Sequence, residues 1–214
     1  MKPLSKLLFC SILACLIASC SKEDTVEDYP SAITELVELN TNTARTVVSM
    51  RTDRGDTFGV TESPLSGAKP DTTYRCLCIY EKVDNKKVHI YQTALVLSMH
   101  PLSAEKYNTL PKVPVHIISH WRTDRYLNFL MSYKTVGVDK HSFGFCEEKT
   151  EVESDGKQTV YVSLLHQKPA ADSEAYTQKF YASVPTYKYA ATYDNIVFTV
   201  TTEDGPIEYK YSLR

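Results

Sequence analysis

Short runs in which apolar and polar side chains alternate fill most of this chain after its first twenty residues. In the clearest run, Tyr126–Thr135, the residues Leu127, Phe129, Met131 and Tyr133 alternate with mostly polar neighbours. A two-residue period places one face of a strand in a core and the other toward solvent. No segment after residue 20 carries a helical period over three turns, so the sequence predicts an all-β protein.

The N-terminal half predicts a small barrel. The turn Asp53–Asp56 joins two of its runs and places Gly55 where a positive φ is expected. Several short runs of this kind are typical of a partly closed barrel, of which the OB-fold is one form, although the pattern leaves a small open sheet as an alternative. The runs are Thr34–Leu39, Arg45–Met50, Thr57–Thr61, Thr73–Val83 and Val88–Met99.

Prolines separate this half from the next. Residues 100–114 contain Pro101, Pro111 and Pro114, and proline cannot donate to a strand ladder. We therefore expect a barrel domain at 33–105 and a second domain at 112–214. The spacing of the later runs predicts an antiparallel, immunoglobulin-like β-sandwich. These runs are Val115–Arg122, Tyr126–Thr135, His141–Glu147, Thr159–His166, Lys179–Val184, Asp194–Thr201 and Ile207–Leu213.

The first 19 residues have the features of a signal peptide. Lys2 and Lys6 precede an apolar stretch that is too short to span a bilayer. It ends in Ile17–Cys20, which is similar to the lipobox of bacterial lipoproteins. We expect cleavage after residue 19 and lipid on Cys20, which anchors the chain through its acyl groups. The alternative is a plain signal peptide with an accidental cysteine.

Residues 20–32 predict a flexible tether after the lipidated cysteine. Ser21, rather than an acidic residue, follows Cys20, which resembles outer-membrane sorting. Together with Lys22, Glu23 and Asp24 it resembles the export signal of surface-exposed lipoproteins. We expect the protein on the cell surface, with the periplasmic face of the outer membrane as the alternative. A charged tether without any sorting function also fits these residues.

Three cysteines remain beyond the anchor, and an odd number cannot form a complete disulfide framework within one chain. Cys76 and Cys78 are two residues apart on one predicted strand and so point to the same face. Small buried hydrophobes are the expected role. A bridge from either of them to Cys146 and a metal site remain alternatives.

Composition argues against several functions. The net charge is −2, so binding of nucleic acid by neutralising its phosphates is not expected. The sequence has no Gly-x-Ser-x-Gly elbow, no His-Glu-x-x-His motif and no phosphate loop. The six histidines are scattered. We therefore assign no catalytic residue, no metal ligand and no cofactor, and expect a protein that is not an enzyme.

The densest polar and aromatic cluster offers a candidate ligand site. An aromatic platform with charged hydrogen-bonding groups suits a sugar or a peptide. The alternative is structural, with the tryptophan as a core anchor and the charged pair as a hairpin turn. Exposed tyrosines of the barrel would extend the site, because such barrels bind polymers across one face. The candidate residues are Trp121, Arg122, Asp124, Arg125, Tyr126, Tyr80 and Tyr91.

Taken in order, several motifs resemble the NigD-like lipoproteins of Bacteroidota. The resemblance implies an OB-type barrel followed by a β-sandwich, and it carries no catalytic residues over. Besides the lipobox and Tyr29-Pro30, it rests on the turn Asp53–Asp56, PDTTYR (Pro70–Arg75), HWRTDRYLNF (His120–Phe129), HSFGF (His141–Phe145) and AYTQKFYASVP (Ala175–Pro185).

These observations predict a lipid-anchored outer-membrane protein that acts as a non-catalytic binding or accessory module. Its expected partners are the membrane, through the lipid, and a glycan, a peptide or an outer-membrane protein complex. A protection or immunity factor against a secreted peptide toxin is the first alternative, which the family name suggests. A hydrolase or metal-dependent enzyme is the second.

Overall fold

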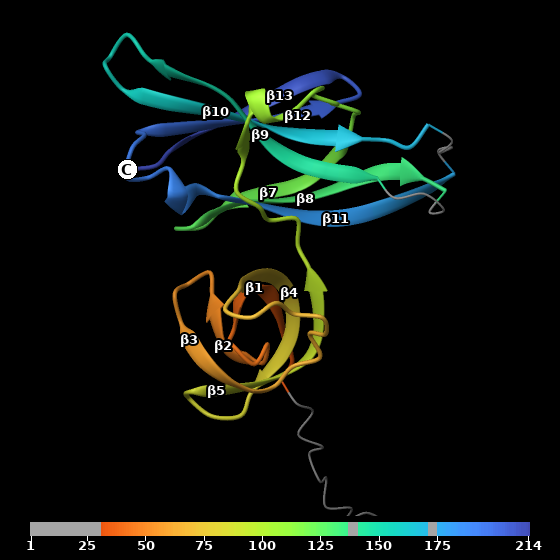
Figure 1. Ribbon diagram of the computed structural model, residues 1–214, viewed down its shortest axis with the longest axis vertical. Helices are drawn as coiled ribbons and strands as arrows, with labels where there is room; N and C mark the ends of the chain where they lie inside the picture. Colours follow the sequence, from red (N-terminus) through yellow and green to blue (C-terminus); the bar gives the residue numbers. More distant parts are fainter. Residues whose placement is uncertain (1–30, 137–140, 171–174) are drawn as a thin grey trace, which may run out of the picture. The chain divides into compact units, whose positions relative to one another are not determined.

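The first five strands close into a barrel (Figure 1). The computed structural model describes residues 31–136, 141–170 and 175–214. The strands pair in the order β1-β2-β3-β5-β4, β4 also pairs with β1, and β3–β5 is the one parallel pair of the barrel. Closure pairs both edges of the sheet, so the barrel forms instead of the open alternative. The strands are β1 (Ile33–Thr41), β2 (Val47–Thr52), β3 (Thr57–Glu62), β4 (Thr73–Lys82) and β5 (Lys87–Leu95).

Alternate residues of the barrel strands fill its interior. Val37 on β1 and Cys76 and Cys78 on β4 are all 0% exposed, and they belong to one apolar cluster. The two thiols share a face because side chains two residues apart on a strand point the same way. All three described cysteines are free and buried. This confirms their role as small hydrophobes, and Cys146 forms no bridge with either of the others.

The turn between β2 and β3 has the predicted geometry. Gly55 has a φ of +95°, in the left-handed region that favours glycine. Its amide donates to the carbonyl of Thr52 at 3.0 Å, and the Thr52 amide donates to the carbonyl of Asp56 at 2.9 Å. The turn therefore fixes the register in which β2 and β3 pair.

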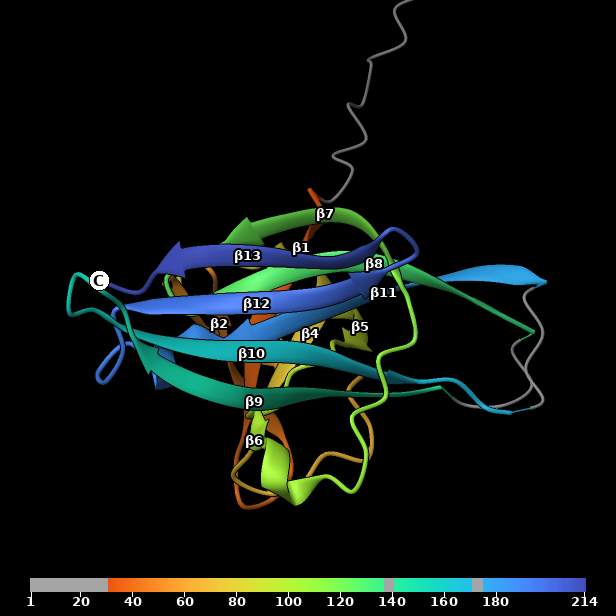
Figure 2. The ribbon, with the colours of Figure 1, turned by 90° about the horizontal axis from the view of Figure 1, so that it is seen from above.

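The remaining strands form a sandwich of two sheets (Figure 2). One has the order β13-β12-β10-β9-β6 and the other β11-β8-β7. Pairing is antiparallel except for β10–β12 and the short β6–β9 pair, because the chain crosses through β11 before it returns as β12. The strands are β6 (Leu102–Ser103), β7 (His116–Arg122), β8 (Tyr126–Thr135), β9 (Ser142–Val152), β10 (Gln158–Gln167), β11 (Tyr176–Pro185), β12 (Asn195–Thr202) and β13 (Gly205–Ser212).

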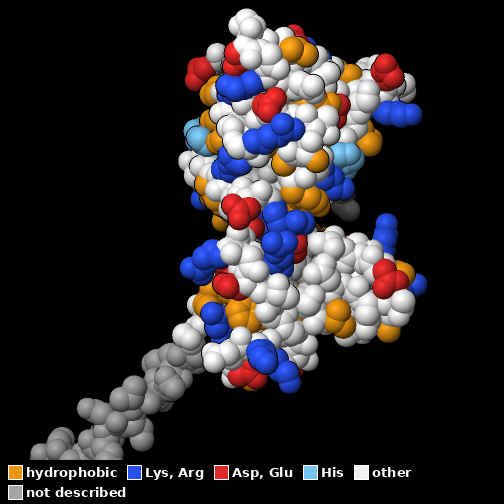
Figure 3. All heavy atoms as spheres, turned by 90° about the vertical axis from the view of Figure 1, so that its left-hand side faces the viewer, with side chains coloured by type: hydrophobic (Ala, Val, Ile, Leu, Met, Phe, Trp, Pro, Cys, Tyr) orange, Lys and Arg blue, Asp and Glu red, His pale blue; other side chains and the backbone are white. Residues whose placement is uncertain are grey.

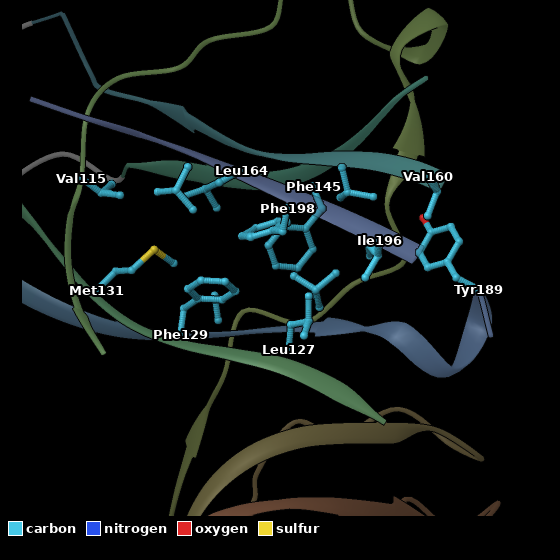
Figure 4. Close-up of a cluster of buried hydrophobic side chains, with 14 of the residues drawn as sticks. Val115, Leu127, Phe129, Met131, Phe145, Val160, Leu164, Tyr189, Ile196 and Phe198 are labelled. Carbon is cyan, nitrogen blue, oxygen red and sulfur yellow. The ribbon is translucent and has the colours of Figure 1, made fainter. Parts of the chain in front are cut away.

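The sandwich core lies between these two sheets (Figure 4). Phe129 of β8 and Phe198 of β12 are 0% exposed, and their ring centroids are 4.9 Å apart. Phe145 of β9 meets Phe198 edge-on at 5.8 Å. The fold class predicted from the alternation, an OB-like barrel followed by a β-sandwich, is confirmed.

The outward face of β8 is less exposed than its alternation predicts. Asn128 is 0% exposed and Ser132 is 5% exposed, although both lie on the polar face of the strand. Asn128 accepts a hydrogen bond from Arg75 of the barrel, so a neighbouring domain covers what the pattern assigns to solvent. A single strand's period cannot reveal that second contact.

The segment after β5 bonds to β11 of the sandwich. The amide of Leu97 donates to the carbonyl of Tyr181, and the Ser183 amide donates to the carbonyl of Leu97. These contacts begin before the predicted linker at 100–114, and the limits 33–105 and 112–214 stay a prediction. The described helices are the short η2 (Ala104–Lys106) and η3 (Thr186–Lys188). Within the described ranges, none is long and apolar enough to cross a membrane.

Candidate functional site

The predicted aromatic cluster lies on the hairpin between β7 and β8. Trp121 is the penultimate residue of β7, and Tyr126 begins β8. Thr123 closes the turn, because its amide donates to the carbonyl of Tyr126 and its hydroxyl accepts from the Tyr126 amide. The side chains then separate into two environments, since Tyr126 is 3% exposed and Trp121 is 36% exposed.

One environment is a polar contact between the hairpin and β1 of the barrel. The Tyr126 hydroxyl donates to Glu38 Oε1 at 2.7 Å, and Arg125 Nε donates to the same oxygen at 2.9 Å. Burial and the neighbouring Glu38 carboxylate both raise the pKa of Tyr126. Burial alone lowers the pKa of Arg125, but the bond to Glu38 raises it overall. Both side chains therefore hold the hairpin against the barrel.

Arg75 on β4 completes this contact, although it is not among the predicted site residues. Its Nη2 donates to Asp53 Oδ2 at 2.7 Å and to Asn128 Oδ1 at 3.1 Å, and its Nε donates to Ser183 Oγ at 3.2 Å. Its guanidinium lies 4.2 Å from the centre of the Tyr126 ring. An arginine beside the apolar run Cys76–Tyr80 is the one sequence signal for it, because a buried charge requires partners.

The other environment is a cavity of about 350 Å³ beside Trp121. Trp121 and Tyr181 supply aromatic surface to the lining. Glu35 and Asp53 also contribute to it, although Glu35 Oε1 accepts from Tyr80 and Asp53 Oδ2 accepts from Arg75. Threonine hydroxyls and two leucines complete the lining; these residues are Thr34, Thr123, Leu36 and Leu77. Aromatic faces beside hydrogen-bonding carboxylates suit a sugar ring or a peptide segment.

Of the predicted binding residues, Trp121 lines this cavity and the others do not. Tyr80 is a correction, because it is 1% exposed in the barrel core and its hydroxyl donates to Glu35 Oε1 at 2.5 Å. Tyr126 is buried in the polar contact, also without surface for a ligand. Tyr91 on β5 is 41% exposed and packs edge-on against His89, outside the cavity lining.

Arg122 and Asp124 are exposed beside the hairpin turn. Positive and negative side chains are interspersed on the face seen in Figure 3, with no continuous basic band among its described residues. No group of three or more His, Cys, Asp or Glu residues in the described ranges could hold a metal ion. The predicted lipidation at Cys20 and the sorting residues Ser21–Asp24 lie outside the described residues.

Comparison with models of protein families shows to which family the chain belongs. A model described as the NigD-like C-terminal beta sandwich domain matches residues 98–211. The chain belongs to the NigD-like family. The match spans the sandwich from just after β5 almost to the C-terminus, so the resemblance seen in the sequence motifs is confirmed. No curated protein matches the chain.

Solved structures resemble this NigD-like protein over both domains. A NigD-like immunity protein from Bacteroides caccae is 27% identical with a TM-score of 0.67, covering 87% of this chain and 99% of that one. A candidate toxin-related protein from Parabacteroides distasonis is 16% identical, with a TM-score of 0.65 and coverage of 85% and 94%. A candidate lipoprotein from Bacteroides fragilis is 10% identical, with a TM-score of 0.58 and coverage of 86% and 99%. The last two share the fold alone.

Proposed function

We propose that this NigD-like protein is a non-catalytic binding protein of the outer membrane whose ligand contacts the cavity beside Trp121. The observation that carries the proposal is the exposure of Trp121, 36%, in a cavity that Tyr181 and polar residues also line. Large aromatic side chains are normally withdrawn from water, and tryptophan is enriched among residues that dominate binding energies. Family membership also supports a role without catalysis.

The chain supports a direct binding assay, because Trp121 is its only tryptophan. Oligosaccharides and peptides can be titrated while the intrinsic fluorescence is followed, and a glycan array selects the sugars. We expect Trp121→Ala to weaken binding at least tenfold, since an aromatic hot spot contributes about 2 kcal/mol or more. For the variants, calorimetry replaces fluorescence. Tyr91→Ala, which removes an exposed ring outside the cavity, is the matched control and should bind like wild type. Equal binding by Trp121→Ala would refute the site.

An immunity role is the second candidate, and the similarity to the Bacteroides caccae immunity protein favours it. The ligand would then be a secreted toxic polypeptide. A deletion strain is challenged with culture fluid from competing strains of the same genus. We expect reduced survival that the wild-type gene restores and the Trp121→Ala gene does not. Survival equal to that of the parent strain with every competitor would count against immunity. Binding of a glycan would then be the remaining proposal.

Anchoring by lipid on Cys20 is part of the proposal. The 19-residue leader that ends just before Cys20 and the lipobox-like residues Ile17–Cys20 support it. We expect wild-type protein in the detergent phase of a phase partition, with a mass raised by acyl groups, and Cys20→Ala protein without them. Protease added to intact cells then tests surface exposure. Unacylated wild-type protein in the aqueous phase would end this part of the proposal without touching the binding site.

A further inference from the structure

The sandwich contains a second cavity, of about 260 Å³, that shares no lining residue with the one beside Trp121. It lies where β7 and β8 approach the end of β10. His141 and His166 form part of its wall, and Tyr133 and Lys134 of β8 form another part. An apolar cavity of about 150 Å³ accepts a benzene molecule, so this one has room for an aromatic ring and a small polar group.

A hydrogen-bonded pair of imidazoles shapes the inner wall. His166 is 1% exposed, and its Nδ1 lies 3.0 Å from the carbonyl of Val113, to which it can only donate. Its Nε2 is then an acceptor, and His141 Nδ1–H donates to it at 2.7 Å. Burial lowers the pKa of His166 to about 4, which keeps that ring neutral near pH 7. The backbone carbonyl thereby fixes the tautomers of both rings.

Aromatic rings make the wall rigid and largely apolar. Phe143 stacks on His166 with a centroid distance of 4.4 Å and an interplanar angle of 10°, and Tyr133 packs on His141 at 4.3 Å. Phe180 packs against Phe143 from behind at 4.5 Å. These ring contacts pack the two histidines of the wall against the sandwich core.

The mouth of this cavity is basic although the chain as a whole is slightly acidic, with a net charge of −2. Among the described residues, Lys134, Lys168 and His116 contribute to its lining, and Glu203 is the one acidic residue there. Lys134 Nζ donates to Thr177 Oγ1 at 3.0 Å, which holds the ammonium at the mouth. An ammonium has three donors, so this bond leaves capacity for an anion.

We propose that this cavity binds a carboxylate attached to an apolar or aromatic group. The ring would lie against Tyr133 and the histidine pair, and the carboxylate would meet the ammonium of Lys134 at the mouth. Apolar walls with a few fixed polar groups are the usual construction of a small-ligand site. The carboxylate belongs either to a free acid or to the C-terminus of a polypeptide. The inference does not depend on the proposed function of the Trp121 cavity.

Isothermal titration calorimetry of the folded protein with 3-phenylpropanoate tests the charge requirement. Its uncharged amide is the matched probe, and we expect the amide to bind at least tenfold more weakly. Lys134→Met keeps the apolar stem and should weaken the acid at least fivefold. Lys149→Met removes an exposed lysine of β9 that pairs with Glu151, and should bind like wild type. Binding that is equal for acid and amide, or unchanged in Lys134→Met, would overturn the proposal.

Nuclear magnetic resonance of the histidine side chains locates the ligand. We expect 3-phenylpropanoate to shift the resonances of His141 and His166 and to leave the indole resonance of Trp121 unchanged. Shifts confined to the Trp121 indole would refute the site. A peptide ending in phenylalanine distinguishes the two sources. Binding by its free C-terminus but not by its amidated form supports a polypeptide end, and binding by the small acid alone supports a free metabolite. The proposal would also be refuted if no probe binds at concentrations up to roughly 20 mM, which is about 20-fold above a Kd of 1 mM.

Discussion

Replacing Arg75 with methionine should lower the free energy of unfolding by about 3 kcal/mol. The Arg75 side chain is 2% exposed and donates hydrogen bonds to Asp53, Asn128 and Ser183. Removing one partner of a buried charged pair typically costs about 3–5 kcal/mol, because the other charge is left without compensation. Methionine keeps the apolar stem of the side chain and removes the guanidinium, so the loss reports mainly the polar contact between barrel and sandwich.

Three structural details place the expected value at the lower end of that range. Asp53 is 18% exposed, so water can solvate part of its carboxylate after the substitution. Asn128 Oδ1 keeps its hydrogen bond from Ser183 Oγ at 2.6 Å. In addition, Arg75 Nη1 is buried and bonds no other described residue, so its removal costs nothing. A loss of about 3 kcal/mol corresponds to a fall in Tm of roughly 6–12 °C for a chain of this size.

Urea denaturation provides the assay. Trp121 fluorescence reports on the hairpin and circular dichroism reports on the strands. Arg122→Met removes an exposed arginine from the end of β7 and should change stability by less than about 0.5 kcal/mol. Asp53→Asn should fall between the two. The reasoning is refuted if Arg75→Met costs less than about 1 kcal/mol, because the buried network would then contribute little to holding the domains together.

Three further outcomes are expected. Because burial lowers the pKa of His166 from about 6.5 to about 4, folding favours the neutral ring. The contribution of this ring to the free energy of unfolding is therefore complete above pH 6.5, and up to about 3 kcal/mol of it is lost as the pH drops to 4. The urea midpoint should depend less on pH over this range in His166→Phe than in wild type. An unchanged pH dependence would contradict the assignment of this effect to His166. Phe129→Ala should lower the free energy of unfolding by about 3–5 kcal/mol, measured in the same way, because it opens a cavity between the sheets. Mass spectrometry after thiol alkylation should find Cys76 and Cys78 unmodified in the native protein and modified in denaturant; rapid native labelling would mean that the barrel opens readily.

The strands themselves could be predicted because each is encoded locally. The alternation along Tyr126–Thr135 gives β8 with its bounds unchanged, and the glycine turn gives the β2–β3 hairpin. Burial of Cys76 and Cys78 follows from their two-residue spacing within an apolar run. Prolines between residues 100 and 114 predict a linker there, but β6 at Leu102–Ser103 already pairs with β9 of the sandwich, so the domain limits stay a prediction. These features depend on neighbours in the chain, which the sequence states directly.

The candidate site could be predicted only in part. Trp121 lines a cavity, but Tyr80 and Tyr126 on equally aromatic strands are buried, since strand pairing decides which face of each points inward. Arg75 lies 108 residues from Ser183 and 53 from Asn128, and nothing in its local sequence indicates these partners. The pairing of His141 with His166 likewise joins the residue just before β9 to the end of β10.

By itself, the sequence determined an all-β chain with a small barrel and a sandwich, because strand periods and turns depend on short-range chemistry. Tertiary structure alone decided that the barrel closes, that β10 and β12 run parallel, and that Arg75 reaches across to the sandwich. It also decided that two separate cavities form, one beside Trp121 and one beside the histidine pair. Those features join residues from distant strands, and their positions follow from the packing of whole sheets.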